Sequence, residues 1–166
     1  IIEMVTLTRL DCAVSSAAMM RTSLAEAVHH VRHRQVMGAN LIDQPLMVRV
    51  LADLALETAG ATALAFRLAA SFDRAAADPA DAAYARLMTP VIKYWVCKSA
   101  APVIGEAMEC LGGNGYIEEG NLARQFRDAP VNAIWEGSGN VMCLDVMRVI
   151  SKGGKLLDAV LSRLEQ

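Results

Sequence analysis

The sequence is short of charge, and of positive charge in particular. Charged residues make up 20% of its 166 residues, below the share of about 25% found in typical soluble proteins. Sixteen lysines and arginines stand against 18 acidic side chains, which gives a net charge of −2. A chain with this balance has no overall electrostatic signature for nucleic acid, so a DNA-binding role would need a local basic patch.

Segments that direct a chain into or across a membrane are also missing. Residues 1–4 contain neither a basic region nor the start of a long apolar core, so they are not a signal peptide. A membrane-spanning helix needs about 20 predominantly apolar residues. No apolar stretch reaches this length uninterrupted, because charged side chains break the longest ones, at Glu57, Arg67, Lys93 and Lys98.

No two cysteines have the C-x-x-C spacing of a redox or metal motif. The four cysteines stand at positions 12, 97, 110 and 143, and three of them lie among apolar residues in helical patterns. This distribution indicates buried free thiols in a reducing compartment. We therefore expect a cytoplasmic protein.

The H-E-x-x-H metal motif is absent as well, although three histidines lie close together. His29 and His33 are four residues apart and so share one face of a helix. The sequence nominates no third ligand, and a solvated or partner-facing helix end is the better interpretation. We predict no metal site.

Apolar residues, by contrast, are abundant, at 54% of the chain. The length suits a single domain with a real core. So many apolar residues indicate that helices bury more than one face, in a core and in an interface with another domain or subunit.

The apolar positions recur with the period of a helix, and no segment alternates long enough to predict a strand. The sequence predicts an all-α fold, an antiparallel four-helix bundle joined by short connections. Proline 90 and proline 102 lie inside the third helix and predict a kink or break. The expected helices span residues 8–37, 45–72, 81–111 and 141–150, with a possible short helix at 121–127 and a loop at 130–140.

The last residues differ in character from this bundle. Residues 152–155 read K-G-G-K and predict a flexible break before a short helix at 156–165. We interpret residues 1–166 as one helical domain of a longer protein, with residues 152–166 beginning a C-terminal extension.

The most informative motif is the run W-E-G-S-G-N at residues 135–140. Glu136 follows a large aromatic residue and precedes two glycines, at the end of a loop that leads into a helix. Burial in such a tight turn could tune the carboxylate as a proton acceptor. Alternatively, Glu136 only accepts backbone N–H bonds within the turn.

Taken in order, four segments resemble the C-terminal domain of acyl-CoA dehydrogenases. They are Arg9, the R-x-x-M-G element at 34–38, the E-x-x-G-G-N-G element at 109–115 and the W-E-G-S-G-N run. The wording of residues 135–146 is most similar to the AidB-type alkylation-response branch of that family. Each element is weak alone, but the ordered set with its spacing is specific.

The resemblance implies a role for each matching residue. Glu136 corresponds to the catalytic base, because Thr8, at the position some members use instead, cannot accept a proton at neutral pH. Arg9 and Trp135, the latter in place of a tyrosine, correspond to substrate-site residues. The residues that correspond to FAD contacts are Arg34, Met37 (for a phenylalanine), Glu109 (for a glutamine), Gly113, Ser138 and Asn140.

The implied activity is α,β-dehydrogenation of an acyl-CoA thioester, in which Glu136 removes the α-proton and a hydride passes to FAD. In the family, the arginine that Arg34 matches reaches the flavin of a neighbouring subunit. The resemblance therefore also implies a homo-oligomer, a dimer or tetramer. The domain alone would hold FAD weakly or not at all and would be inactive.

Two other functions remain open. One is a DNA-binding, alkylation-response flavoprotein with only residual dehydrogenase activity. In that case Arg148, on the last predicted bundle helix, would contact a phosphate of DNA, unless it only forms an i,i+3 ion pair with Asp145. The other is a purely structural oligomerisation module.

Overall fold

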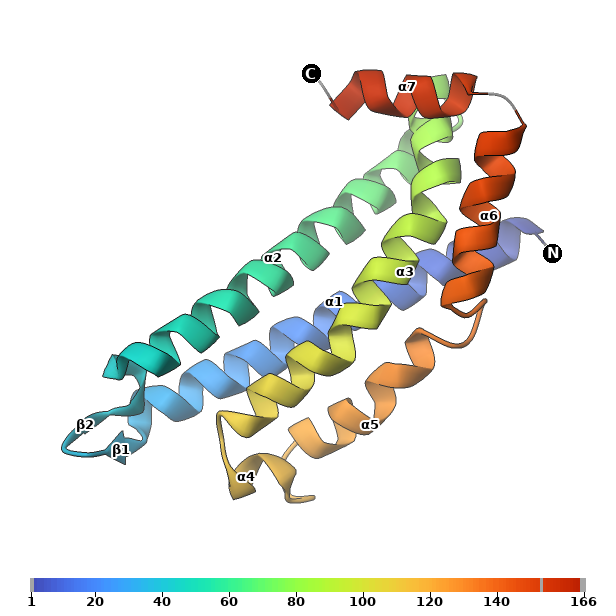
Figure 1. The fold of residues 1–166 in the computed structure, drawn as a ribbon. Helices are drawn as coiled ribbons and strands as arrows, with labels where there is room; N and C mark the ends of the chain where they lie inside the picture. The colour runs from blue at the N-terminus through green and yellow to red at the C-terminus, as the bar shows by residue number, and fades with distance from the viewer. Residues whose placement is uncertain (1, 153, 165–166) are drawn as a thin grey trace.

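The computed structural model describes residues 2–152 and 154–164, and nearly all of them are helical (Figure 1). Three long helices form the body of the molecule: α1 (Ile2–His33), α2 (Pro45–Arg74) and α3 (Pro79–Glu109). Four shorter ones follow: α4 (Gly113–Tyr116), α5 (Leu122–Asn132), α6 (Gly139–Ser151) and α7 (Lys155–Leu164). The predicted all-α bundle is confirmed.

The fourth position of the bundle is shared by two helices in succession. In Figure 1, α1, α2 and α3 lie beside one another, and α5 and then α6 run along α3. The last helix, α7, packs on α3 and crosses the end of the bundle where α2 gives way to α3. The loop between α5 and α6 therefore lies beside the middle of α3, where it can meet side chains from the long helices.

Local sequence signals explain several helix ends. Pro45 stands in the first turn of α2 and Pro79 in that of α3, where the missing N–H costs nothing. The Asp78 side chain accepts a hydrogen bond from the backbone N–H of Ala80 at 2.8 Å and so caps α3. After α3 ends, Gly112 adopts φ 61°, a left-handed conformation that glycine takes at no steric cost.

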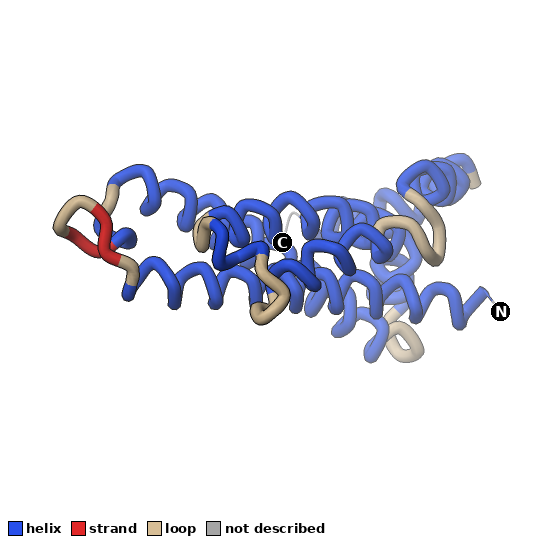
Figure 2. The backbone as a smooth tube through the Cα atoms, turned by 90° about the horizontal axis from the view of Figure 1, so that it is seen from below, coloured by secondary structure: helices blue, strands red, loops and turns tan. Residues whose placement is uncertain are grey.

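The segment after α1 differs from the prediction. The first helix ends at His33 rather than near Met37, and residues 35–40 form a small antiparallel hairpin of β1 (Gln35–Val36) and β2 (Ala39–Asn40). Met37 and Gly38 make the two-residue turn, with φ values of 55° and 81°, as a tight hairpin requires. A two-residue strand is too short to show a period-two alternation, so no pattern in residues 35–40 predicts a strand. Figure 2 shows the hairpin at the end of the bundle opposite the N-terminus.

One prediction about prolines was wrong. Pro130, expected to begin a loop, lies inside α5, which continues to Asn132. Pro90 and Pro102 lie inside α3, which is not broken but bends, as Figure 1 shows, in agreement with the kink rather than the break. A proline removes a single helical hydrogen bond, and the packing of the neighbouring turns can hold the rest of the helix together.

The core lies between α1, α2 and α3. Its α1 side is formed by small residues and two larger ones, at Ala13, Ala17, Met20, Ala27 and Val31, all of which are buried. Some larger apolar residues lie outside this core: Val14 of α1 is 40% exposed, and Leu46 of α2 is 75% exposed. The small alanine side chains allow helix backbones to pack closely on the buried side of α1.

A buried carboxylate ties α2 to α3 near the short connection between them. Asp81 is fully buried, and its oxygens accept hydrogen bonds from Arg74 Nε at 2.6 Å and from the Arg67 guanidinium at 3.2 Å. The same guanidinium lies 4.2 Å from the centre of the Tyr84 ring. A carboxylate can be buried at this position because two cations and their N–H donors replace the water it loses.

Three of the four thiols are buried, as expected, whereas Cys143 is exposed. Burial raises the pKa of Cys97 to about 11 and also raises that of Cys12. Both therefore remain protonated at neutral pH. None of the described helices has the length and the apolar content that crossing a membrane would require.

Candidate active site

The turn between α5 and α6 holds Glu136 in an unusual backbone conformation. Glu136 has φ 57° and Gly137 has φ 108°, so two successive residues occupy the left-handed half of the conformational map. For a residue with a Cβ this conformation costs on the order of 1–3 kcal/mol and persists only where surrounding contacts impose it. Three consecutive carbonyl groups of this turn supply those contacts.

A lysine from α3 holds two of these carbonyls. The Lys93 side chain is 1% exposed, and its Nζ donates hydrogen bonds to the carbonyl oxygens of Trp135 at 2.9 Å and Gly137 at 2.6 Å. Burial lowers the pKa of Lys93 below its ordinary value, because the charged form loses its hydration. Lys93 is thus hydrogen-bonded to the backbone on both sides of Glu136.

An arginine from α1 holds the carbonyl in between. Arg9 Nε donates to the Glu136 carbonyl oxygen at 2.9 Å, and its Nη1 donates to Asp145 of α6 at 2.9 Å. This substrate-site candidate is therefore joined directly to the backbone of the candidate base. Its side chain is only 14% exposed.

Asp145 lies on the inner side of α6. It is 8% exposed, whereas Ile150 on the same helix is 37% exposed. Burial alone would raise the pKa of Asp145, but the hydrogen bonds and charges of Arg86 and Arg9 outweigh it and lower that pKa. Arg86 Nη2 lies 2.8 Å from Asp145 Oδ1. Asp145 is buried because two arginines from other helices meet there.

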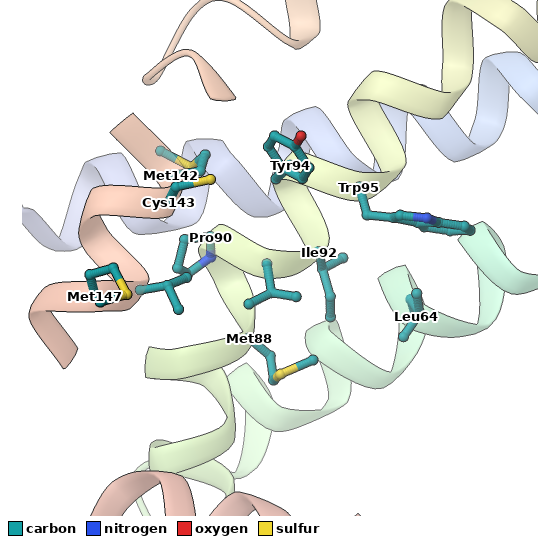
Figure 3. A pocket seen from close by; sticks show the side chains of 11 residues that line it. Leu64, Met88, Pro90, Ile92, Tyr94, Trp95, Met142, Cys143 and Met147 are labelled. Carbon is teal, nitrogen blue, oxygen red and sulfur yellow. The ribbon is translucent and has the colours of Figure 1, made fainter. Parts of the chain in front are cut away.

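The turn is also supported by apolar side chains of α3 and α6. A Cβ added to Gly137 would lie 2.7 Å from Met142 Cε, and one added to Gly139 would lie 2.9 Å from the Tyr94 ring. Met142 and Tyr94 also line an apolar pocket of about 620 Å³ bounded by α2, α3 and α6, with Leu64, Met88, Trp95 and Met147 (Figure 3). Close packing thus requires glycine on both sides of Ser138.

Trp135 and Thr8 both make hydrogen bonds within their own segments. Trp135 is 54% exposed, and its indole N–H donates to the Asn132 side chain at 3.1 Å. The Thr8 hydroxyl shares its hydrogen bond between the carbonyls of Val5, at 3.0 Å, and Met4, at 3.2 Å, within α1. Thr8 therefore uses its hydroxyl in its own helix.

Three of the predicted cofactor residues meet at a second place. Arg34, Glu109 and Gly113 line one cavity of about 570 Å³, which also borders α1 and the end of α3. Arg34 and Glu109 are exposed, and a Cβ added to Gly113 would meet no atom within 4 Å. Met37, at the tip of the hairpin, is 94% exposed. These groups offer a cation and an open backbone to a ligand.

The other two predicted cofactor residues lie at the opposite end of α5. Ser138 and Asn140 are exposed at the start of α6, and the Ser138 hydroxyl makes no cap hydrogen bond to its helix. An uncapped helix N-terminus suits a negatively charged or polar ligand. Between the two clusters in the sequence lies α5, whose 11 residues make a helix about 16 Å long at 1.5 Å per residue. The Arg34 cation and the free N–H groups at the start of α6 suit the phosphates and polar groups of FAD.

A groove beside the turn carries a concentration of positive charge. Arg9, Arg86, Arg148 and Lys152 line a cavity of about 450 Å³ together with Asp145. The Arg148 side chain is 64% exposed, and its Nη1 lies 3.7 Å from Asp145 Oδ1. The predicted i,i+3 pair therefore exists, but it is longer than the bonds that Asp145 makes to Arg9 and Arg86.

A second basic patch is neutralised. Arg127 forms a two-pronged pair with Glu118, at 2.7 and 2.9 Å, and its hydrogen bonds lower the pKa of that glutamate. Both side chains are exposed, so this is a surface ion pair.

Lys93 and Arg86 are site residues that the sequence motifs did not predict. In the sequence, Lys93 was noted only because its charge interrupts an apolar stretch. It lies on the same helical face as Thr89, Val96 and Ala100, all of which are buried. A lysine in the buried stripe of a helix was the available signal. Arg86, which is partly exposed, has no comparable signal.

Comparison with known proteins agrees with the motifs. The family model described as acyl-CoA dehydrogenase, C-terminal domain, matches residues 1–151. The chain is 52% identical over 158 residues to the putative acyl-CoA dehydrogenase AidB of Escherichia coli, covering 95% of this chain and 29% of that protein. It is 29% identical over 136 residues to the human mitochondrial short-chain specific acyl-CoA dehydrogenase, covering 82% of this chain and 31% of that protein.

Solved structures show the same fold. The crystal structure of Caenorhabditis elegans ACDH-11 in complex with C11-CoA superposes with a TM-score of 0.94 at 37% identity, covering 98% of this chain and 28% of the other. The chain belongs to the acyl-CoA dehydrogenase family and has the fold of its C-terminal domain. It spans less than a third of the length of the AidB and ACDH-11 chains.

Proposed function

We propose that the chain acts as the C-terminal domain of an FAD-dependent acyl-CoA dehydrogenase, with Glu136 as the base that removes the α-proton of an acyl-CoA thioester. The observation that carries this proposal is the fixed placement of Glu136. Its conformation at φ 57° is imposed by hydrogen bonds from Arg9 and Lys93. Such strain is concentrated at functional sites.

Each neighbouring residue has a part in this proposal. Arg9 and Lys93 hold the backbone, Trp135 forms the exposed wall beside the base, and Met142 and Tyr94 pack against the two glycines of the turn. Bound FAD would supply the hydride acceptor. Arg34, Met37, Glu109 and Gly113 would contact the FAD of a neighbouring subunit, and Ser138 and Asn140 that of their own, in a homo-oligomer.

The substrate class follows from the relatives. The ACDH-11 structure contains C11-CoA, and this chain superposes on it along nearly its whole length. We infer that the complete protein, meaning one with the length of these relatives, binds an acyl-CoA next to Glu136 and Trp135.

Anaerobic mixing of the complete protein with saturated acyl-CoAs of increasing chain length tests this function. At least one acyl-CoA should bleach the visible absorbance of the flavin, because transfer of a hydride reduces it. The corresponding free acids, which lack the thioester that acidifies the α-proton, are the control and should leave the spectrum unchanged. A panel in which no acyl-CoA reduces the flavin would exclude the dehydrogenase function.

A second candidate function is DNA binding in an alkylation response. The specific observation in its favour is the groove lined by Arg9, Arg86, Arg148 and Lys152, in which Arg148 is the most weakly paired to Asp145 of the three arginines. An exposed guanidinium of this kind can bind a phosphate oxygen.

If Arg148 contacts a DNA phosphate, Arg148→Gln in the complete protein should weaken binding to all sequences alike. The slope of log affinity against log salt should fall by about one unit, because one fewer counterion is released. Fluorescence anisotropy with duplex DNA over a series of salt concentrations measures both quantities. Arg49→Gln, at an exposed position of α2, is the matched control. If the affinity for DNA and the salt slope are both unchanged, Arg148 does not contact DNA and only forms its ion pair with Asp145.

A further inference from the structure

Lys93 is a costly residue for its position. It lies in the middle of α3, is 1% exposed and takes no part in the ion pairs found among the described residues. A buried ammonium loses hydration that backbone carbonyls replace only in part. A leucine or methionine would fill the same space without this penalty, so packing alone does not explain a lysine there.

What Lys93 contacts is more specific than a general polar partner. Its Nζ donates to the carbonyls of Trp135 and Gly137, the residues on either side of Glu136, while Arg9 donates to the carbonyl of Glu136 itself. Three successive carbonyl oxygens are thus held by two cations that come from two different long helices. This arrangement fixes the peptide planes on both sides of Glu136, and with them the direction of its Cα–Cβ bond.

The strain in the turn gives these bonds their importance. Glu136 at φ 57° would relax toward an ordinary conformation if its carbonyl neighbours were released. Arg9 alone fixes one carbonyl and leaves the two adjoining peptide planes free to rotate. Lys93 therefore contributes the larger part of the hydrogen bonding that holds the turn.

We infer that Lys93 is a positioning residue, which holds the Trp135–Glu136–Gly137 backbone so that the Glu136 carboxylate is aimed at the substrate. This inference rests on the proposed function and deepens it, since Lys93 acts through Glu136 and touches no reacting atom. It assigns the lysine to the chemical step rather than to substrate affinity.

The test compares Lys93→Met and Lys93→Gln with the wild type in the complete protein loaded with flavin. Stopped-flow reduction by the best acyl-CoA gives a limiting rate and an apparent dissociation constant. Lys93→Met should lower the limiting rate by about 10²-fold, the effect of a displacement near 1 Å at a reacting group. The dissociation constant should stay close to that of the wild type. Lys93→Gln keeps amide N–H donors and should recover part of the rate.

Two further measurements separate positioning from mere stability. In a Glu136→Gln background, Lys93→Met should not slow the residual reduction further, because both substitutions act on the same group. Lys98→Met, at an exposed position of α3, should reduce the flavin at the wild-type rate. If Lys93→Met does not fold with flavin bound, the inference is tested by Lys93→Gln alone, whose limiting rate should fall below that of the wild type.

The outcomes distinguish this inference from the proposed function. Wild-type limiting rates in Lys93→Met or Lys93→Gln, together with a blocked Glu136→Gln, would overturn the role of Lys93 and leave the base in place. Wild-type reduction by Glu136→Gln would instead overturn the proposed base, and the role of Lys93 with it. An equal loss of rate in Lys93→Met with and without Glu136 would also contradict the inference.

Discussion

Glu136→Gln is expected to slow reduction of the flavin by acyl-CoA by about 10²–10⁴-fold, the range that a positioned general base contributes. The amide keeps the shape of the side chain and removes its basicity. The hydrogen bonds from Lys93 and Arg9 go to backbone carbonyls, so the turn should keep its conformation. Stopped-flow absorbance of the complete protein, mixed anaerobically with acyl-CoA, measures the rate.

Two controls belong to this experiment. Glu57→Gln makes the same change of carboxylate to amide at an exposed glutamate of α2 and should leave the rate of flavin reduction unchanged. Thr8→Val removes the hydroxyl at the alternative position of the base, where it bonds only to carbonyls of its own helix. The flavin content of each variant is measured first. Reduction at the wild-type rate by Glu136→Gln, with flavin bound, would show that another group removes the proton.

Gly115→Ala is expected to lower the free energy of unfolding by about 3 kcal/mol, at the upper end of the range for overpacking. Gly115 is buried in α4, and an added Cβ would lie 2.2 Å from the carbonyl oxygen of Met108 in α3. Main chain cannot rotate away as a side chain can, so α4 would have to move as a whole. Urea denaturation of the complete protein, followed by far-UV circular dichroism, measures the loss.

The neighbouring glycines provide the control. A Cβ on Gly120 would meet its closest atoms at 3.8 Å, an ordinary contact, and one on Gly113 would meet none within 4 Å. Gly120→Ala and Gly113→Ala should therefore change the free energy of unfolding by less than about 1 kcal/mol. A loss for Gly115→Ala no larger than theirs would mean that α4 is not held against α3.

The site depends on contacts in which cationic side chains of the long helices bind oxygens of a distant segment. Arg9 and Lys93 bind backbone carbonyls of the Glu136 turn, and Arg9 and Arg86 bind Asp145. Each contact joins the segment 135–145 to α1 or α3. The turn is therefore positioned by the long helices rather than by its own sequence.

The helical fold could be predicted from the sequence because its signals are local. Apolar residues at helical spacing, Pro45 and Pro79 in first turns and Gly112 beyond the end of α3 all act within a few residues of themselves. Errors arose where a local signal was weak. The Met37–Gly38 hairpin is too short to show a period, and Pro130 was given more weight as a helix breaker than one lost hydrogen bond justifies.

By itself the sequence determined the all-α class and the family, because periodicity and an ordered set of motifs are properties of the chain. Only the tertiary structure decided which charged residues are buried. The sequence predicted Asp145 only as an ion-pair partner of Arg148, and Lys93 only as an interruption of an apolar stretch. The partners that compensate their burial lie 42 to 136 residues away in the sequence. A buried charge is tolerated only where such partners converge. That convergence depends on how the helices pack, which no local pattern encodes.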